Sequence, residues 1–120
     1  MIDLQNVLKN GGASVNLKGE TLDFANGYCV SMPAFEVQKS VEGLTQVEVN
    51  TMADEIAFII RAGNMTKTHF IGCWIENDVL FMDVSTHIFN RYDAIEFGKI
   101  GKQLAIWDCA AQDEIILADV

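Results

Sequence analysis

The side chains that hydrolases use for nucleophilic catalysis occur together in one short stretch, Asp83-Val84-Ser85-Thr86-His87. A carboxylate, a hydroxyl and an imidazole are the groups of a catalytic triad. In an extended strand, however, residues two apart point the same way about 6–7 Å apart, too far for a hydrogen bond between serine and imidazole. No nucleophile-elbow sequence accompanies the stretch. We therefore predict that the protein is not an enzyme.

Metal and phosphate sites also lack their usual sequence signals. The three cysteines are widely spaced and form no CxxC pair: Cys29, Cys73 and Cys109. Each lies among apolar neighbours, which is typical of a structural thiol rather than of a zinc ligand or a disulfide framework. His69 and His87 are the only histidines, and the glycines at 11–12 and 98–101 are too sparse for a phosphate loop. We predict neither a metal nor a cofactor.

Two β-rich runs around a polar turn carry the most informative surface. Residues 69–75 and 79–85 flank Glu76-Asn77-Asp78, which predicts a hairpin with Asn77-Asp78 as its turn. Directly opposed residues then share a face. One face is wholly apolar and is expected to join the core: Ile71, Cys73, Ile75, Leu80, Met82 and Val84. The other face mixes aromatic rings, polar groups and a glycine gap: Phe70, Gly72, Trp74, Phe81, Asp83 and Ser85, with His87 continuing it.

Aromatic rings beside a few polar groups are typical of protein hot spots and of small-molecule pockets. The predicted binding residues are Phe70, Trp74, Phe81, Asp83 and Ser85. Another interpretation stays open, in which a helix of the same chain covers this face and Asp83 caps that helix or pairs with Arg91. A slip of one residue in the register would also move these side chains off a shared face.

The elements that would position this face follow from hydrophobic periodicity and capping signals. Helices are expected over residues 4–9, from as early as 45 to about 62, and from 90 to about 100. Strands are expected over 13–17, 28–32, 35–41, 69–75, 79–85, 103–107 and 114–117. This order, α-β-β-β-α-β-β-α-β-β, predicts an α+β fold: a small antiparallel sheet or sheets with two main helices and a short N-terminal helix. At 120 residues the chain is expected to form a single domain, 1–120.

The net charge of −9 bears on the partners, because direct nucleic-acid binding needs a basic patch and the eight Lys and Arg residues are scattered. Two explanations of the acidic excess stay open: solubility, or competition with nucleic acid for a basic groove on a partner protein. No apolar run approaches the roughly 20 residues of a membrane span, and the first residues lack the pattern of a signal peptide. We therefore expect a cytoplasmic protein that contacts no membrane.

The second half of the sequence resembles a group of small bacteriophage and prophage proteins. The resemblance is carried by the segments 72–75, 80–85, 91–99, 103–108 and 113–115. The group has a strand pair, an "RxxAIxxG" helix, then "NQLAIWD" and a closing "EI"; Lys102 stands where the group often has asparagine. The resemblance implies a phage setting, in a bacterial host cell, and a sheet covered by the preceding helix. It assigns no catalytic residue.

Three functions are compatible with these observations. The first, by analogy with other small acidic phage proteins, is an anti-CRISPR-like inhibitor that binds a host defence complex stoichiometrically. The second is a protein that sequesters a small nucleotide-type immune signal on the hairpin face; the acidic balance counts against it, because phosphates need basic groups and only Arg61, Lys67 or Arg91 are near. The third is an accessory or assembly protein of the phage. An aromatic outer face also leaves a homodimer open.

Overall fold

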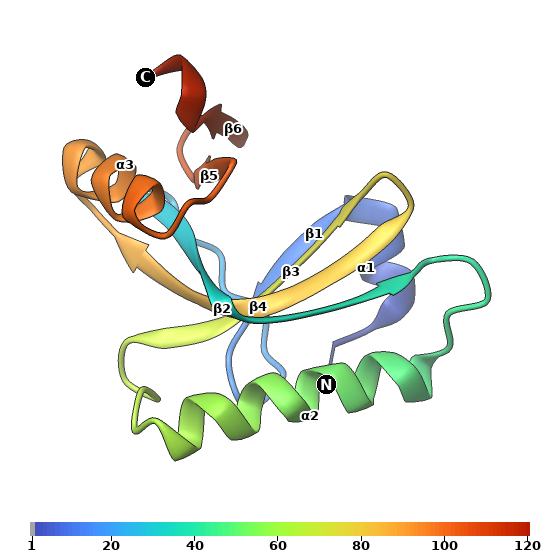
Figure 1. The fold of residues 1–120 in the computed structure, drawn as a ribbon. Helices are drawn as coiled ribbons and strands as arrows, with labels where there is room; N and C mark the ends of the chain where they lie inside the picture. The colour runs from blue at the N-terminus through green and yellow to red at the C-terminus, as the bar shows by residue number, and fades with distance from the viewer. Residues whose placement is uncertain (1) are drawn as a thin grey trace.

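An antiparallel six-stranded sheet, in the order β1-β3-β4-β2-β5-β6, forms the centre of the computed structural model, which describes residues 2–120 (Figure 1). The elements are α1 (Leu4–Asn10), β1 (Gly12–Val15), β2 (Tyr28–Ser40), α2 (Gln46–Ala62), β3 (His69–Glu76), β4 (Val79–Ile88), α3 (Arg91–Ile100), β5 (Ala105–Asp108), β6 (Asp113–Ile116) and a 3-10 turn, η1 (Leu117–Asp119). The predicted α+β fold, with two main helices and a short N-terminal helix, is confirmed. No helix within residues 2–120 is long and apolar enough to cross a membrane.

The β3–β4 hairpin has the predicted register. Glu76 pairs with Val79, and Gly72 pairs with Asp83. The turn residues Asn77 and Asp78 both have positive φ angles, 51° and 61°. A two-residue hairpin turn of type I′ requires this backbone, because its twist matches that of the flanking strands. The hairpin therefore divides its side chains between two faces as expected.

β2 is one long strand, where the sequence predicted two. Met32 and Glu36 pair with the adjacent residues Val84 and Asp83, so residues 33–35 form a bulge. A proline is tolerated at a bulge because no ladder hydrogen bond is lost there. The odd number of inserted residues reverses the alternation of faces along the strand. This reversal explains why the pattern resembles two separate strands.

The larger core lies between the sheet and α2, which runs along one side of the sheet in Figure 1. Thr45 and Glu48 form a capping box at the start of α2, which fixes where the helix begins. The apolar hairpin face joins this core as predicted. The buried members of this larger core are Ile2, Leu4, Val7, Val15, Val49, Met52, Ala53, Ile56, Ala57, Ile60, Ile71, Cys73, Leu80, Met82 and Val84.

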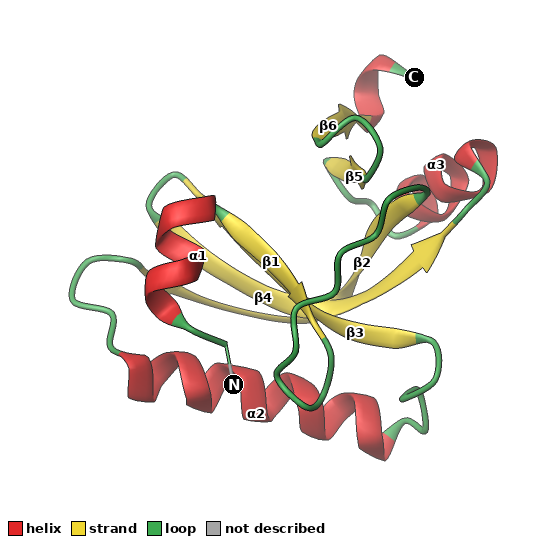
Figure 2. Ribbon diagram, turned by 180° about the vertical axis from the view of Figure 1, so that it is seen from behind, coloured by secondary structure: helices red, strands yellow, loops and turns green. Residues whose placement is uncertain are grey.

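A second, smaller core holds residues 89–120, which we call the C-terminal unit. Its buried members are Val30, Ala94, Ile106 and Leu117. Figure 2 shows α3, β5 and β6 together at one end of the sheet, away from α2. A Cβ atom at Gly98 would lie 2.8 Å from a methyl of Leu117 and 2.9 Å from Ile106, so a glycine here lets α3 approach closely. β5 joins β2 through only two residue pairs, Tyr28 with Asp108 and Cys29 with Trp107.

The hairpin turn gives a direct test of the fold. Replacing Asp78 by glycine is expected to raise the free energy of unfolding by about 0.5–1 kcal/mol, because glycine adopts the left-handed backbone without steric cost. Urea unfolding measures the change. The control, Asp54→Gly in the middle of α2, is expected to lower stability, since glycine is unfavourable in a helix. Equal destabilisation by both substitutions would contradict the turn geometry.

Candidate functional site

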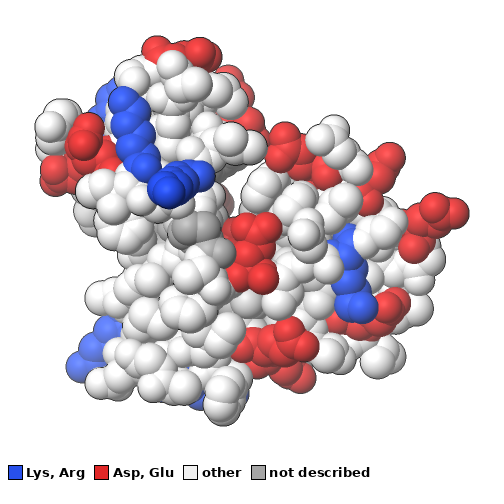
Figure 3. All heavy atoms as spheres, in the orientation of Figure 1, with Lys and Arg blue, Asp and Glu red and all other residues white. Residues whose placement is uncertain are grey.

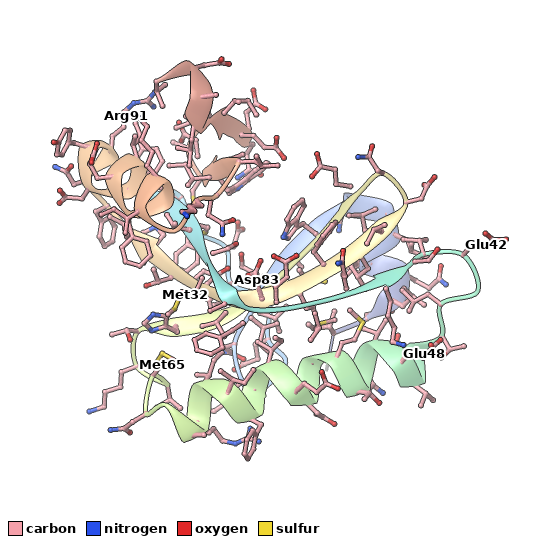
Figure 4. The ribbon with its side chains drawn as sticks, in the orientation of Figure 1. Met32, Glu42, Glu48, Met65, Asp83 and Arg91 are labelled. Carbon is pink, nitrogen blue, oxygen red and sulfur yellow. The ribbon has the colours of Figure 1, made fainter. Side chains whose placement is uncertain are left out.

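The mixed face of the β3–β4 hairpin lies on the side away from α2. Figure 3 shows the surface hollowed between this part of the molecule and the C-terminal unit, with acidic side chains on the sheet side of the hollow. Figure 4 places Asp83 below the hollow in this view, where β2 and β4 bend. The predicted binding residues therefore all come from two neighbouring strands, β3 and β4.

Asp83 is fully buried, with 0% of its surface exposed. Its carboxylate accepts hydrogen bonds from Ser31 Oγ at 2.8 Å, Trp74 Nε1 at 3.2 Å and Ser85 Oγ at 2.6 Å. The donors come from β2, β3 and β4, so one side chain ties three strands together. Arg91 does not pair with Asp83; it lies 3.9 Å from Asp108 instead. A carboxylate sealed in this way supports the fold and has no access to a ligand.

Burial shifts the protonation of two facing carboxyl groups. Burial raises the pKa of Asp83, and the hydrogen bonds from Ser85, Ser31 and Trp74 offset part of this rise. Glu36 stands opposite Asp83 in the register, and its pKa is raised by burial and then by the charge of Asp83. All three donors to Asp83 are neutral groups, so no positive charge compensates its negative charge. The ionised carboxylate is therefore less favourable in the folded protein than in water, and ionisation opposes folding.

The gap that Gly72 leaves in this face is filled by side chains of the protein itself. A Cβ atom at Gly72 would collide with Ser85 Oγ and Asp83 Oδ1. Glycine at this position lets the carboxylate and the hydroxyl lie directly over the backbone of β3. The gap therefore accommodates the protein's own polar network rather than a ligand.

The three aromatic rings of the predicted site have different surroundings. Phe70 is 5% exposed and packs against Phe24 of the β1–β2 loop, with ring centroids 5.4 Å apart. Trp74 and Phe81 stack with centroids 4.5 Å apart and remain partly exposed. A loop, not a helix, thus covers one end of the face. Of the five predicted binding residues, only these two stacked rings offer accessible surface, and their binding role stays a prediction.

The face extends beyond the hairpin to residues that the sequence analysis missed. Glu36 and Gln38 of β2 lie opposite Asp83 and Phe81, and Trp107 of β5 lies opposite Cys29. Trp107 is 38% exposed. Glu36 and Gln38 come to lie on this face because of the bulge in β2. Trp107 comes to lie on it because β5 pairs with β2, which is far away in the sequence. Neither leaves a local signal in the sequence.

The Asp83-Val84-Ser85-Thr86-His87 stretch does not form a triad. Ser85 donates its hydroxyl hydrogen to Asp83, and His87 Nε2 lies 2.6 Å from the carbonyl oxygen of Asn26. The serine and the imidazole therefore have separate partners. Within residues 2–120, no three His, Cys, Asp or Glu side chains come together as metal ligands would.

Two of the three cysteines, expected to be unrelated structural thiols, are neighbours. Cys29 Sγ and Cys109 Sγ lie 3.6 Å apart, across the narrow junction between β2 and β5. Burial raises the pKa of Cys29 to about 12, and burial also raises the pKa of Cys109. Cys73 lies apart from this pair in the larger core. The thiol pair is therefore close enough to react but holds its protons tightly.

The C-terminal unit carries most of the exposed apolar surface. Eight of the eleven large hydrophobic residues exposed within 2–120 belong to it: Phe89, Tyr92, Phe97, Ile100, Leu104, Trp107, Ile116 and Val120. Tyr92 and Phe97 of α3 are 71% and 41% exposed, and the predicted helix over residues 90 to about 100 did not include an assignment of its buried side. The sequence signal for that side is the pair Ala94 and Gly98, whose small side chains are buried.

The buried carboxylate predicts a specific pH dependence. Asp83→Ala is expected to lower the free energy of unfolding by about 1–3 kcal/mol, because it leaves the donors of Ser31, Trp74 and Ser85 without their acceptor. A raised native pKa means that the wild type gains stability as the pH falls from neutrality through that pKa. The destabilisation by Asp83→Ala should therefore grow on acidification. Urea unfolding at several pH values measures it, and a difference that shrinks at lower pH would contradict this account.

The thiol pair predicts selective oxidation. A mild oxidant such as hydrogen peroxide should take two electrons and two protons from Cys29 and Cys109 and leave Cys73 reduced. Mass spectrometry after alkylation under denaturing conditions counts the remaining thiols. The rate should rise with pH, because the thiolate is scarce at neutrality. The bond should add roughly 2–4 kcal/mol of stability. Cys29→Ser should abolish it and Cys73→Ser should not; a mixture of pairings would contradict the geometry.

Comparison of the chain with protein-family models, with curated proteins and with solved structures gave no match.

Proposed function

We propose that this chain is a non-enzymatic binding protein that docks on a partner protein through the outer side of α3. The observation that carries the proposal is the exposure of Tyr92, at 71%, and Ile100, at 81%, on a helix that is already packed on its other side. Phe89 and Leu104, at 78% and 83% exposed, flank the two ends of the helix. A surface helix normally places polar residues at such positions.

The packing of α3 explains why this surface is available. Ala94 and Gly98 form the buried side, and residues two positions away along a helix lie almost opposite. Tyr92 and Ile100 therefore point away from the small core rather than into it. Apolar residues grouped in this way mark interaction sites, and tyrosine is among the residues enriched in binding hot spots.

Charge indicates which partner fits. The C-terminal unit has six acidic and three basic residues within a chain of net charge −9. Acidic side chains also lie on the sheet side of the hollow beside this unit, opposite Lys or Arg side chains of the unit itself (Figure 3). Such a surface attracts a basic protein and steers its approach. A protein whose basic groove otherwise holds nucleic acid, next to an apolar patch, has the matching chemistry.

The resemblance to phage proteins suggests the biological setting. In that setting the partner is a host defence complex such as a CRISPR effector, whose nucleic-acid groove is basic, and the chain acts as its stoichiometric inhibitor. An assembly role in the phage would use the same surface on a different partner. The structural observations favour protein binding over both catalysis and sequestration of a ligand on the hairpin face, where Phe70, Asp83 and Ser85 are buried.

The double variant Tyr92→Ser/Ile100→Ser tests the proposal. The wild-type protein should form a complex with a purified CRISPR effector and raise phage survival in a host that carries it. The variant should weaken the complex by about 2 kcal/mol or more, as loss of two hot-spot side chains does, and abolish protection. Both residues are exposed, so the melting temperature should stay close to that of the wild type.

Phe58→Ser is the matched control, because Phe58 is 65% exposed on α2, away from the C-terminal unit. It should bind and protect like the wild type. Equal losses in both variants would contradict a role for α3. If light scattering shows a dimer of the wild type that Tyr92→Ser/Ile100→Ser converts to a monomer, a second copy of this chain occupies the surface and the proposal fails.

A further inference from the structure

A groove lies between the β1–β2 loop and the connection from α2 to β3. Its volume is about 680 Å³, within the range of small-molecule sites. Met65, which Figure 4 labels, is next to the α2–β3 wall of this groove. The groove is on the opposite side of Phe70 from the Trp74–Phe81 stack, and none of its lining residues belongs to α3, although His87 packs edge-on against Phe89 with ring centroids 4.5 Å apart. It is therefore a separate site from the proposed docking surface.

β4 anchors both walls of the groove. Thr86 Oγ1 donates to the carbonyl oxygen of Thr68 at 2.9 Å, which holds the α2–β3 connection. His87 Nε2 lies 2.6 Å from the carbonyl oxygen of Asn26, and its ring stacks on Phe24 with centroids 4.2 Å apart, which holds the β1–β2 loop. Both walls are thus fixed before any ligand arrives, which lowers the entropy lost on binding.

The charge of the groove is opposite to that of the protein. Lys18 and Lys67, one from each wall, line it together with His69 and His87, the only histidines of the chain. None of the described residues that line the groove is acidic, although the chain has 17 acidic residues. Lysine ammonium groups are common ligands of phosphate. Two of them on facing walls favour an anion between them.

Neutral groups that line the groove can orient a bound ligand. Burial lowers the pKa of His69, so its ring serves as a hydrogen-bonding group rather than as a cation at neutral pH. Its Nδ1 is held by Thr68 Oγ1 at 2.7 Å, which leaves Nε2 for a ligand. Phe24, Leu17 and Leu22 give the other part of the lining an apolar character. The groove therefore combines lysine and histidine side chains with the apolar side chains of Leu17 and Leu22.

We propose that this groove binds a small nucleoside phosphate, with its phosphates at Lys18 and Lys67 and its base against the apolar wall. The size of the ligand follows from electrostatics. A small anion within a few ångströms of the two ammonium groups is attracted, whereas a long polyanion extends to where the net charge of −9 repels it. The inference is independent of docking through α3.

Titration of the wild-type protein with ADP, followed by amide NMR, tests the site. Shifts should concentrate at Phe24, at residues 66–69 and at His87. Adenosine and inorganic pyrophosphate, titrated separately, should each bind at least tenfold more weakly than ADP. Pyrophosphate that binds as tightly as ADP would overturn the nucleoside assignment, and the absence of groove shifts at millimolar ADP would overturn the site.

Lys18→Ala/Lys67→Ala should weaken ADP binding by about tenfold, as expected when two exposed charge pairs are lost. The control Lys9→Ala/Lys39→Ala removes the same charge outside the groove and should leave the affinity unchanged. Equal losses in both double variants would show a general charge effect and overturn the assignment. Since neither pair touches α3, complex formation with the effector should be unaffected, so this inference and the docking proposal can fail separately.

Discussion

A carboxylate can be withdrawn from water only if hydrogen-bond donors replace the solvent, and much of this structure depends on how Asp83 meets that requirement. Its donors stand on three different strands, so the network forms only when β2, β3 and β4 have the observed register. The same bonds orient the indole of Trp74, which stacks on Phe81. The accessible aromatic surface is therefore positioned by a buried polar group that no partner can reach. Gly72 is required because any larger side chain would occupy the space of this network.

The bulge in β2 has a comparable influence on the layout of the molecule. The bulge lets Met32 before it and Val37 after it both pack on the larger core, whereas Val30, nearer the start of β2, is buried in the smaller one. One strand thus contributes to two cores of unequal size. The smaller core has few members, and small residues on α3 fill most of its helical side. This allocation of side chains leaves the large apolar residues of the C-terminal unit at the surface.

Local patterns were enough to predict the fold class, the hairpin, its register and its apolar face, because Asn77-Asp78 and strict alternation specify them within a few residues. The candidate site was harder to predict. Asp83 stands out in the sequence, but its donor Ser31 lies 52 residues earlier and is aligned through the bulge, so no local pattern links the two. The packing of Phe24 over Phe70, and of Lys18 and Lys67 along one groove, also leaves no local pattern, because loop placement is decided by tertiary packing. The outward direction of Tyr92 was hidden because helical periodicity shows that a helix has faces but not which one is buried.

The two-pair junction between β2 and β5 has a consequence for the energetics of recognition. We expect a unit held by a small core and a short ladder to sample more orientations than the rest of the sheet. A partner that binds α3 tightly must restrict those orientations. The conformational entropy that the C-terminal unit then loses reduces the affinity of the complex. A covalent link between Cys29 and Cys109, at this same junction, would remove that freedom in advance. The chain therefore has, in two neighbouring thiols, a position at which its binding strength could be adjusted without altering a single contact residue.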